Sequence, residues 1–174
     1  MPSYWLMKSE PDCFSWDDLK SRGKGGEAWD GVRSFQARNF MKAMQIGDLA
    51  FFYHSNIGKA VVGVMEIAAL AHPDASDDTG KWECVDVRAV ADMPNPVPLA
   101  AIKDNSKLDE MVLVNNSRLS VQPVSAAEWA EVCRMGGLKP AEIKASGGGG
   151  QKPAGSAKEA AKSGAEKRPA RKAK

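Results

Sequence analysis

Hydrophobic and polar positions divide the first 144 residues into short segments of alternating strand and helix character. The chain opens on an apolar run, residues 4–7, that changes to Lys8, Ser9 and Glu10 and stops at Pro11. Such a pattern predicts a strand whose end presents an ammonium, a hydroxyl and a carboxylate. Polar groups of this kind at the rim of a hydrophobic core can bind a flat polar ligand.

Two helices are predicted to follow this strand. Ser15 and Asp18 have the spacing of a capping box and predict a short helix that ends in the glycine-rich segment 23–26. A second helix is predicted over residues 35–44, before the turn at Gly47, because apolar residues recur there at helical spacing. Its apolar stripe consists of Ala37, Met41 and Met44.

Four further runs, 49–54, 59–70, 82–90 and 119–124, have strand character. The run 60–65 is apolar on both faces, and Gly63 within it predicts a bend or a close backbone approach. These strands are followed by a last helix, which Ser125 caps and which runs through Met135 to two glycines.

The order of elements is β, α, α, β, β, β, short helical pieces, β, α. Short turns rather than crossover helices join neighbouring strands, so we predict an α+β fold: a mixed, mostly antiparallel β-barrel with helices packed outside. The 174 residues are about one domain's worth. We place that domain at residues 1–144.

Charge separates this domain from the last thirty residues. The segment 145–174 holds 8 Lys or Arg against 2 Glu, which leaves 16 basic and 20 acidic residues for 1–144. Glycine, alanine and lysine dominate the segment, so it cannot build a core, and we predict a disordered basic tail. The tail would add sequence-independent attraction to phosphates or serve only as a solubilising extension. Any affinity of the acidic body for nucleic acid must come from a local patch.

Cysteine and histidine usage argues against a metal site. The three cysteines, Cys13, Cys84 and Cys133, show no paired spacing, so we predict buried thiols in a reducing compartment. The two histidines, His54 and His72, lie far apart in sequence. The sequence has no targeting signal or apolar run long enough for a membrane span, so we expect a cytoplasmic protein without a membrane partner.

The segment 29–33 is the second candidate for chemistry. Trp29 stands in a predicted turn, where it either fills the core or forms a platform on which a base stacks. Arg33 would meet a phosphate or pair with Asp30. No Gly-x-Ser-x-Gly elbow supports a serine triad around His54.

Lys8 and Glu10 lie two residues apart on one strand and therefore face the same side. They would form a surface ion pair, bind the edge of a base, or act as a catalytic base with its orienting carboxylate. These three alternatives remain open at this point.

Several motifs in one register resemble the EVE domain family over residues 2–140. They are Tyr4-Trp5-Leu6-Met7-Lys8-Ser9-Glu10-Pro11, Trp29-Asp30-Gly31-Val32-Arg33 running into Gln36-Ala37-Arg38-Asn39-Phe40-Met41, Gly47-Asp48 with Phe52-Tyr53-His54-Ser55-Asn56, and Leu119-Ser120-Val121-Gln122-Pro123-Val124. That family belongs to the PUA-like barrels and is related to the YTH domains. The resemblance implies a reader of modified bases, most of all modified cytosine in DNA, that needs no cofactor and no metal.

The resemblance to YTH domains also has local support. Lys8-Ser9, Trp29, Gly63-Val64-Met65-Glu66 and the Lys81-Trp82 strand look like segments of those domains. The YTH domains place a further cage tryptophan in the loop before the Lys-Trp strand, whereas the loop 73–80 here is acidic and has no aromatic residue. The opposing wall must come from Tyr53, His54 or the strand at Leu119.

These observations lead to a non-catalytic reader, with DNA favoured over RNA, that acts as a monomer. Its location would be the nucleoid in a bacterium or the nucleus in a eukaryote. The rival readings are a PUA-like amidohydrolase acting on acylated cytidine and a tether that binds nucleic acid through its tail alone. The predicted ligand-binding residues are Lys8, Ser9, Glu10, Trp29, Asp30, Val32, Tyr53, His54, Ser55, Leu119 and Ser120, and the predicted phosphate contacts are Arg33, Arg38 and Lys42; no catalytic residue is assigned.

Overall fold

The computed structural model describes residues 3–143. The predicted disordered tail, 145–174, lies outside the described residues. The strands are β1 (Tyr4–Ser9), β2 (Glu27–Ala28), β3 (Leu49–His54), β4 (Ala60–Pro73), β5 (Glu83–Pro98) and β6 (Val121–Val124). The α-helices are α1 (Trp16–Ser21), α2 (Phe35–Ala43), α3 (Leu99–Lys103), α4 (Val112–Asn115) and α5 (Ala126–Gly136), and the 3-10 turns are η1 (Gly23–Gly25), η2 (Ser106–Leu108) and η3 (Pro140–Glu142).

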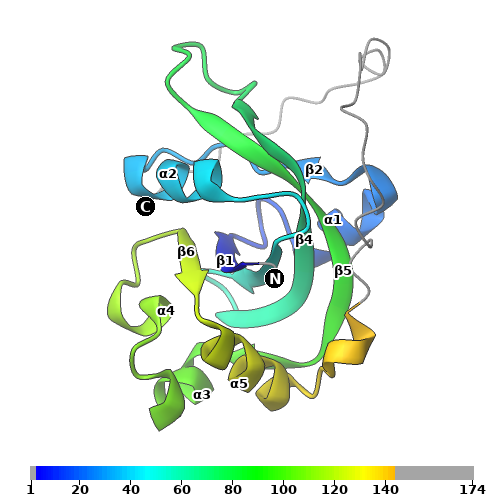
Figure 1. Ribbon diagram of the computed structural model, residues 1–174, viewed down its shortest axis with the longest axis vertical. Coiled ribbons are helices and arrows are strands. Elements are labelled where there is room, and N and C mark those ends of the chain that lie inside the picture. Colours follow the sequence, from blue (N-terminus) through cyan, green and yellow to red (C-terminus); the bar gives the residue numbers. More distant parts are fainter. Residues whose placement is uncertain (1–2, 144–174) are drawn as a thin grey trace.

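The six strands form one mixed sheet with the order β2-β5-β4-β3-β1-β6. Only the β1–β3 pair in this sheet is parallel among the described residues, and the other neighbours are antiparallel. The long β4–β5 ribbon curves strongly, and helices cover the outside of the sheet (Figure 1). The predicted α+β class, with a mostly antiparallel sheet and external helices, is confirmed.

The predicted closure into a barrel is wrong. The edge strands β2 and β6 do not pair with each other in the described part of the chain, so the sheet stays open. β2 has only two residues, and within the described chain it pairs with β5 alone. The helix α2 packs against both β5 and β6 and covers this opening instead.

Parallel pairing of β1 with β3 determines where the polar ends of these strands lie. The register places Lys8 opposite Tyr53 and Ser9 opposite His54. Because parallel strands end at the same edge of a sheet, the polar residues that follow both strands are brought together. The Ser55 N–H continues the ladder by donating to the Ser9 carbonyl at 2.9 Å.

Alternation along β1 separates two hydrophobic cores. Trp5 and Met7 point into a core that includes Trp29 and Phe52, beneath α1 and α2. Leu6 points to the opposite face, into a core with residues of α3 and α5. Each fully buried side chain of this size stabilises the fold by about 1.5 to 3 kcal/mol. The two faces therefore bury the whole length of β1 up to its polar end.

Local sequence signals explain the helix boundaries. Ser15 and Ser125 both form complete capping boxes, with Asp18 and Glu128 as the partners, so α1 and α5 begin where predicted. The last helix ends at Gly137, which has a φ of 72° that favours glycine. No helix among the described residues is both long and apolar enough to cross a bilayer.

Gly63 of β4 has the close neighbour that its position predicts. A Cβ atom at this position would lie 2.2 Å from the ring of Trp16, so the α1 helix can approach the strand only at a glycine. The predicted strands 59–70 and 82–90 are longer in the structure, as β4 and β5. Register shifts along their pairing, one of them between Val61 and Gly63, accompany the strong curvature.

Candidate functional site

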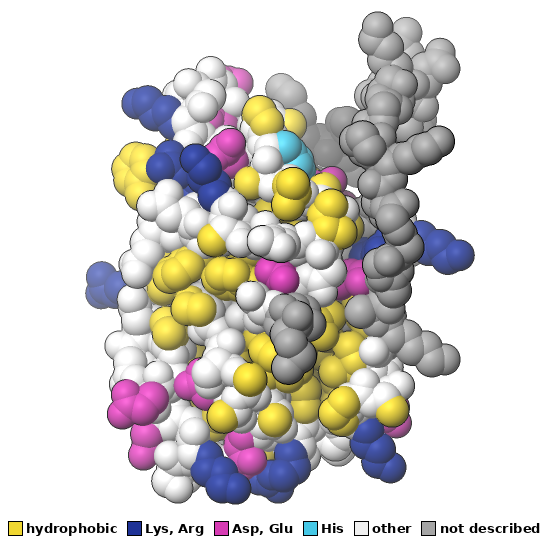
Figure 2. Space-filling model, in the orientation of Figure 1, with side chains coloured by type: hydrophobic (Ala, Val, Ile, Leu, Met, Phe, Trp, Pro, Cys, Tyr) yellow, Lys and Arg dark blue, Asp and Glu magenta, His cyan; other side chains and the backbone are white. Residues whose placement is uncertain are grey.

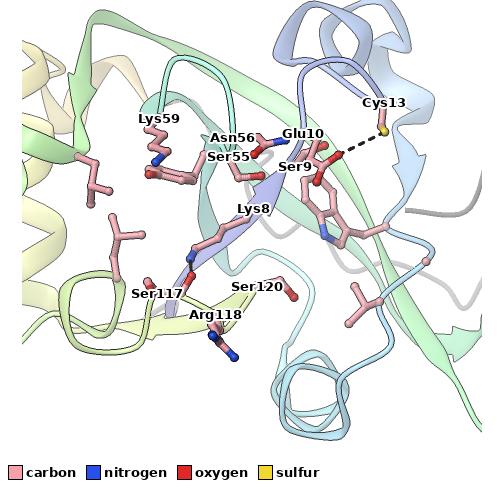
Figure 3. A pocket seen from close by; sticks show the side chains of 16 residues that line it. Lys8, Ser9, Glu10, Cys13, Ser55, Asn56, Lys59, Ser117, Arg118 and Ser120 are labelled. Atoms are coloured by element: carbon pink, nitrogen blue, oxygen red, sulfur yellow. Dashed lines mark hydrogen bonds between the residues drawn. The ribbon is translucent and has the colours of Figure 1, made fainter. Parts of the chain in front are cut away.

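A cavity of about 330 Å³ lies where β1 and β3 end. Four parts of the chain line it: the end of β1 with the turn that follows, the loop 29–32, the β3–β4 connection, and the segment that leads from α3 to β6 (Figure 3). The lining residues are Lys8, Ser9, Glu10, Cys13, Trp29, Gly31, Val32, Tyr53, Ser55, Asn56, Lys59, Leu99, Leu113, Ser117, Arg118 and Ser120.

Lys8 crosses this cavity and is fixed at its far end. Its ammonium donates a hydrogen bond to the Ser117 carbonyl at 2.6 Å and lies 5.8 Å from the centre of the Tyr53 ring. Burial lowers the pKa of Lys8 to about 8 and raises the pKa of Tyr53 to about 12. No ion pair joins Lys8 to Glu10 in the part of the chain that the structure describes, so the surface-pair interpretation is wrong.

The turn after β1 positions the other two polar groups of the opening motif. The Ser9 hydroxyl is buried and donates to the Phe14 carbonyl at 2.6 Å. The carboxylate of Glu10 faces the cavity and lies 3.7 Å from the Cys13 sulfur, a contact that Figure 3 shows. Cys13 is exposed, so the prediction of a buried thiol is wrong there, although it is confirmed for Cys84 and Cys133.

Trp29 is one of the residues that line the cavity, and it also belongs to the core. It is 0% exposed, and its ring meets Phe14 and Phe52 edge to face at centroid distances of 6.5 and 5.4 Å. The main-chain N–H of Trp29 donates to the Val85 carbonyl at 2.8 Å. The two interpretations of Trp29, core filling and base platform, are therefore compatible in position. In the free chain, however, the indole has no exposed face.

Asp74 anchors the loop that carries Trp29. Its carboxylate accepts hydrogen bonds from the Gly31 N–H at 2.9 Å, from Arg33 at 3.1 Å, and from both the N–H and the hydroxyl of Ser76. Burial opposes ionisation, but the hydrogen bonds from Ser76, Gly31 and Arg33 outweigh it and lower the pKa of Asp74. The acidic loop before β5 has no aromatic residue that could form a wall of the cavity. It supplies Asp74 instead, which positions the loop 29–33.

The three predicted phosphate contacts lie outside the cavity. Arg33 forms an ion pair with Asp74 and a hydrogen bond with Ser76, rather than the expected pair with Asp30. Lys42 pairs with Glu83 at 3.4 Å. These acidic partners already offset both charges, which argues against their roles at phosphates.

Three predicted ligand-binding residues are also absent from the cavity lining. His54 instead accepts a hydrogen bond from the main-chain N–H of Trp16 at 3.0 Å, and its burial lowers the pKa of the imidazole against the opposing effect of Asp17. Leu119 is a buried core residue, and Asp30 is half-buried beside the lining residues Trp29 and Gly31. The other predicted residues, from Lys8 to Ser120, do line the cavity.

Sequence reasoning missed two cations at this site. Lys59 and Arg118 are exposed lining residues on opposite sides of Lys8, as Figure 3 shows. Neither forms an ion pair within the described chain. Asn56 has a φ of 74°, a conformation that asparagine tolerates, and it helps to form the β3–β4 turn. This preference of asparagine for turns was the one local sequence signal for the cavity wall beside Lys59.

The described residues contain no group of three or more His, Cys, Asp or Glu side chains that could hold a metal ion. The cavity itself combines apolar walls with a few convergent polar groups, which is typical of a site for a small organic ligand.

Comparison with known proteins assigns the chain to a family. The model of the EVE domain matches residues 3–135. The chain belongs to the EVE domain family. Human thymocyte nuclear protein 1 is 37% identical over 172 residues, and the match covers 80% of this EVE domain protein and 76% of its human relative.

Solved structures share this EVE fold. A protein from Agrobacterium tumefaciens is 58% identical with a TM-score of 0.77, covering 78% of this chain and 94% of its own. Human THYN1 in complex with DNA that contains 5-methylcytosine is 38% identical with a TM-score of 0.73, covering 79% and 99%. A YTH domain from Zygosaccharomyces rouxii MRB1 is 17% identical with a TM-score of 0.51, covering 79% and 89%, and this likeness shows the fold alone.

Proposed function

We propose that this EVE domain protein is a non-catalytic reader that binds a modified nucleobase, foremost modified cytosine in DNA, in the cavity beside Lys8. The observation that carries the proposal is a cavity lined by both Trp29 and Lys8, in a chain 38% identical to a protein solved with 5-methylcytosine DNA. At about 330 Å³ the cavity is at the small end of ligand pockets and suits one nucleoside.

Entry of a base requires two movements. A base in duplex DNA must first be flipped out of the stack, at a cost of a few kcal/mol. Side chains that cover Trp29 must then shift, because the indole has no exposed face before the base arrives. Side-chain changes of this size are common at interfaces. Stacking on Trp29 would recover about 1 to 3 kcal/mol.

Hydrogen bonds to the base edge would come from charged and main-chain groups. Within the described chain the Lys8 ammonium has one hydrogen-bond acceptor, the Ser117 carbonyl, so its other N–H groups can face the base. Glu10 supplies a carboxylate acceptor at the same cavity. The Ser9 hydroxyl already donates to Phe14, which leaves it only its acceptor lone pairs.

Lys59 and Arg118 are better placed than Arg33 to meet the phosphates that flank the bound base. Both line the cavity and lack ion-pair partners in the described chain. Phosphate contacts add affinity that does not depend on sequence and that falls with salt. Arg38 remains a candidate for a more distant phosphate.

Discrimination between matched oligonucleotides tests the reader function. We expect the full chain to bind DNA with 5-methylcytosine about tenfold more tightly than unmodified DNA, because one buried methyl group contributes about 0.8 kcal/mol and a fitted pocket adds shape selection. Fluorescence anisotropy at fixed salt measures both affinities. Equal affinity for the two, and for oligonucleotides with other modified cytosines, would contradict the proposal.

A charge variant separates the cavity rim from the pocket itself. The Lys59→Gln, Arg118→Gln double variant is expected to weaken binding to both oligonucleotides and leave their ratio unchanged. The slope of the logarithm of affinity against the logarithm of salt concentration should fall by about one for each phosphate contact that is lost. Lys139→Gln, at the exposed lysine that precedes η3 outside the cavity, is the control.

Lys8 makes base binding depend on pH. Because burial lowers its pKa to about 8, the ammonium is mostly charged at pH 7 and mostly neutral at pH 9. A charge-assisted hydrogen bond is about twice as strong as a neutral one, so affinity should fall as the pH rises through 8, by at most about tenfold between pH 7 and pH 9. Tyr53, with a pKa of about 12, stays neutral throughout.

The Lys8→Met variant is the control for this titration. It should bind more weakly at pH 7 and lose the dependence between pH 7 and pH 9. A slope that persists in the variant would show that another group titrates and that Lys8 does not cause the pH dependence.

The relatives favour a binding domain over an enzyme. Nothing in the comparisons supports the amidohydrolase alternative, whereas human THYN1 is seen with methylated DNA. Incubation with acylated and methylated cytidine followed by mass spectrometry should return the nucleosides unchanged. The monomeric state and the location, nucleoid or nucleus, stay predictions; the human relative is called a nuclear protein.

A further inference from the structure

An exposed aromatic ring beside the cavity loop has no role in the pocket. Phe35, the first residue of α2, is 59% exposed, and its ring stacks on Trp82 with centroids 4.8 Å apart and planes 25° apart. The Arg38 guanidinium lies 4.9 Å from the Phe35 centroid and 5.8 Å from the Trp82 centroid. We call these three residues the aromatic–arginine surface. A phenylalanine ring that is this exposed keeps apolar area in contact with water, which a bound partner can remove.

The charge of this surface is not offset by an ion pair. Arg38 donates to the Lys81 carbonyl at 2.8 Å and to the Asn39 side-chain oxygen at 3.3 Å. No carboxylate among the described residues lies within ion-pair distance of it, and its Nε is buried without a hydrogen-bond partner. Its neighbours Arg33 and Lys42, by contrast, both have acidic partners. No carboxylate of the described chain therefore offsets the charge of Arg38.

The aromatic–arginine surface continues from the cavity along the chain. Phe35 follows the lining residue Val32 by three positions, which limits the distance between their Cα atoms to about 11 Å. The first turn of α2 contains no acidic residue that would repel a phosphate. Hydrophobic and basic side chains lie side by side over the left end of α2 in Figure 2.

We propose that the aromatic–arginine surface binds an unpaired nucleotide next to the base held in the cavity. The base of that nucleotide stacks on the exposed face of Phe35, and its phosphate meets the Arg38 guanidinium. The proposal rests on the proposed reader function and adds a second subsite to it. A paired neighbour in duplex DNA cannot offer its face to Phe35, so this subsite favours single-stranded flanks.

The test uses the full chain and three ligands: free 5-methyl-2′-deoxycytidine, a single-stranded oligonucleotide with one 5-methylcytosine, and the unmodified oligonucleotide. Phe35→Ala should weaken binding to both oligonucleotides by roughly tenfold, since one stacked base is lost. Binding of the free nucleoside should not change, because a single nucleoside fills only the cavity. Phe35→Tyr keeps the ring and should retain wild-type affinity.

Ile46→Ala is the matched control, because Ile46 is exposed to 52% and follows the opposite end of α2. It should bind all three ligands like the wild type. Arg38→Gln should lower the slope of affinity against salt for the oligonucleotides by about one. Circular dichroism melting of each variant shows whether the fold is kept.

The two proposals fail in different ways. If the wild type prefers the methylated oligonucleotide and Phe35→Ala binds both oligonucleotides as the wild type does, the second subsite is wrong and the reader function stands. If the wild type shows no preference, the reader function is wrong. A loss of nucleoside affinity in Phe35→Ala equal to the loss of oligonucleotide affinity would also overturn the second subsite.

Discussion

Replacement of Asp74 by alanine is expected to lower the free energy of unfolding by about 3 kcal/mol and to weaken binding of the modified base at least tenfold. The carboxylate is 3% exposed and accepts hydrogen bonds from Gly31, Arg33 and Ser76. Its removal leaves a partly buried guanidinium and two main-chain donors without their acceptor, which costs about 1 to 3 kcal/mol per buried group before solvent relieves part of it. Base binding falls because the loop 29–33 loses its anchor.

Urea denaturation and the oligonucleotide titration measure these two effects. Asp78→Ala is the matched control, because Asp78 is exposed in the same loop. It should leave both stability and affinity within experimental error. The contrary outcome is an Asp74→Ala variant that is less stable and yet prefers methylated over unmethylated DNA as the wild type does. That result would show that the loop 29–33 does not depend on this carboxylate for its position at the cavity.

The same carboxylate makes stability depend on acid. The folded chain holds the pKa of Asp74 below the ordinary 3.8, so the unfolded chain binds the proton more readily. The stabilisation is therefore complete above about pH 5 and is lost as the pH falls through the lowered pKa of the folded state. Asp74→Asn should show a smaller acid-induced loss than the wild type.

Trp29→Ala is expected to have the largest effect of all, a loss of about 3 to 5 kcal/mol in the free energy of unfolding together with the loss of base discrimination. The indole is fully buried between Phe14 and Phe52, and alanine would leave a cavity in the main core. A variant that fails to fold says nothing about stacking. Trp29→Phe, which keeps a smaller ring in place, therefore carries the functional test.

Trp129 provides the control for that variant. It is buried to a similar degree in the second core, where it stacks on Phe51 with centroids 3.9 Å apart. Trp129→Phe should cost a comparable amount of stability without changing the preference for methylated DNA. Trp29→Phe should reduce that preference several-fold. Equal preference in the two variants would show that Trp29 only fills the core.

Local signals in the sequence were sufficient for most of the elements. The capping boxes at Ser15 and Ser125 each depend on residues three positions apart, and both helices begin where these patterns place them. The strand β3 has the predicted bounds because its hydrophobic run is bracketed by turn residues. The barrel prediction failed because closure depends on the edge strand β2. That strand has only two residues, too few to show the alternation of polar and apolar positions by which a strand is predicted.

The site was predictable only in part, because local sequence patterns do not show which distant residues the fold brings together. Lys8 and Glu10 were found because an apolar strand ends at them, and Trp29 because a large ring stands in a turn. The ion pair of Arg33 was expected with Asp30 because its actual partner, Asp74, lies 41 residues away, and no local pattern joins the two. Lys59 and Arg118 were missed because a single surface cation in a turn resembles any other until the fold places it at the cavity.

The parallel pairing of β1 with β3 has a thermodynamic consequence. Every wall of the cavity comes from a different part of the chain, between Lys8 and Ser120, so no isolated fragment can hold the ligand. Occupancy and global folding are therefore linked, and a ligand at one hundred times its Kd adds about 2.7 kcal/mol to the free energy of unfolding. The melting temperature of the whole domain thus reports on the cavity, and a panel of modified nucleosides can be ranked by the shifts that they cause.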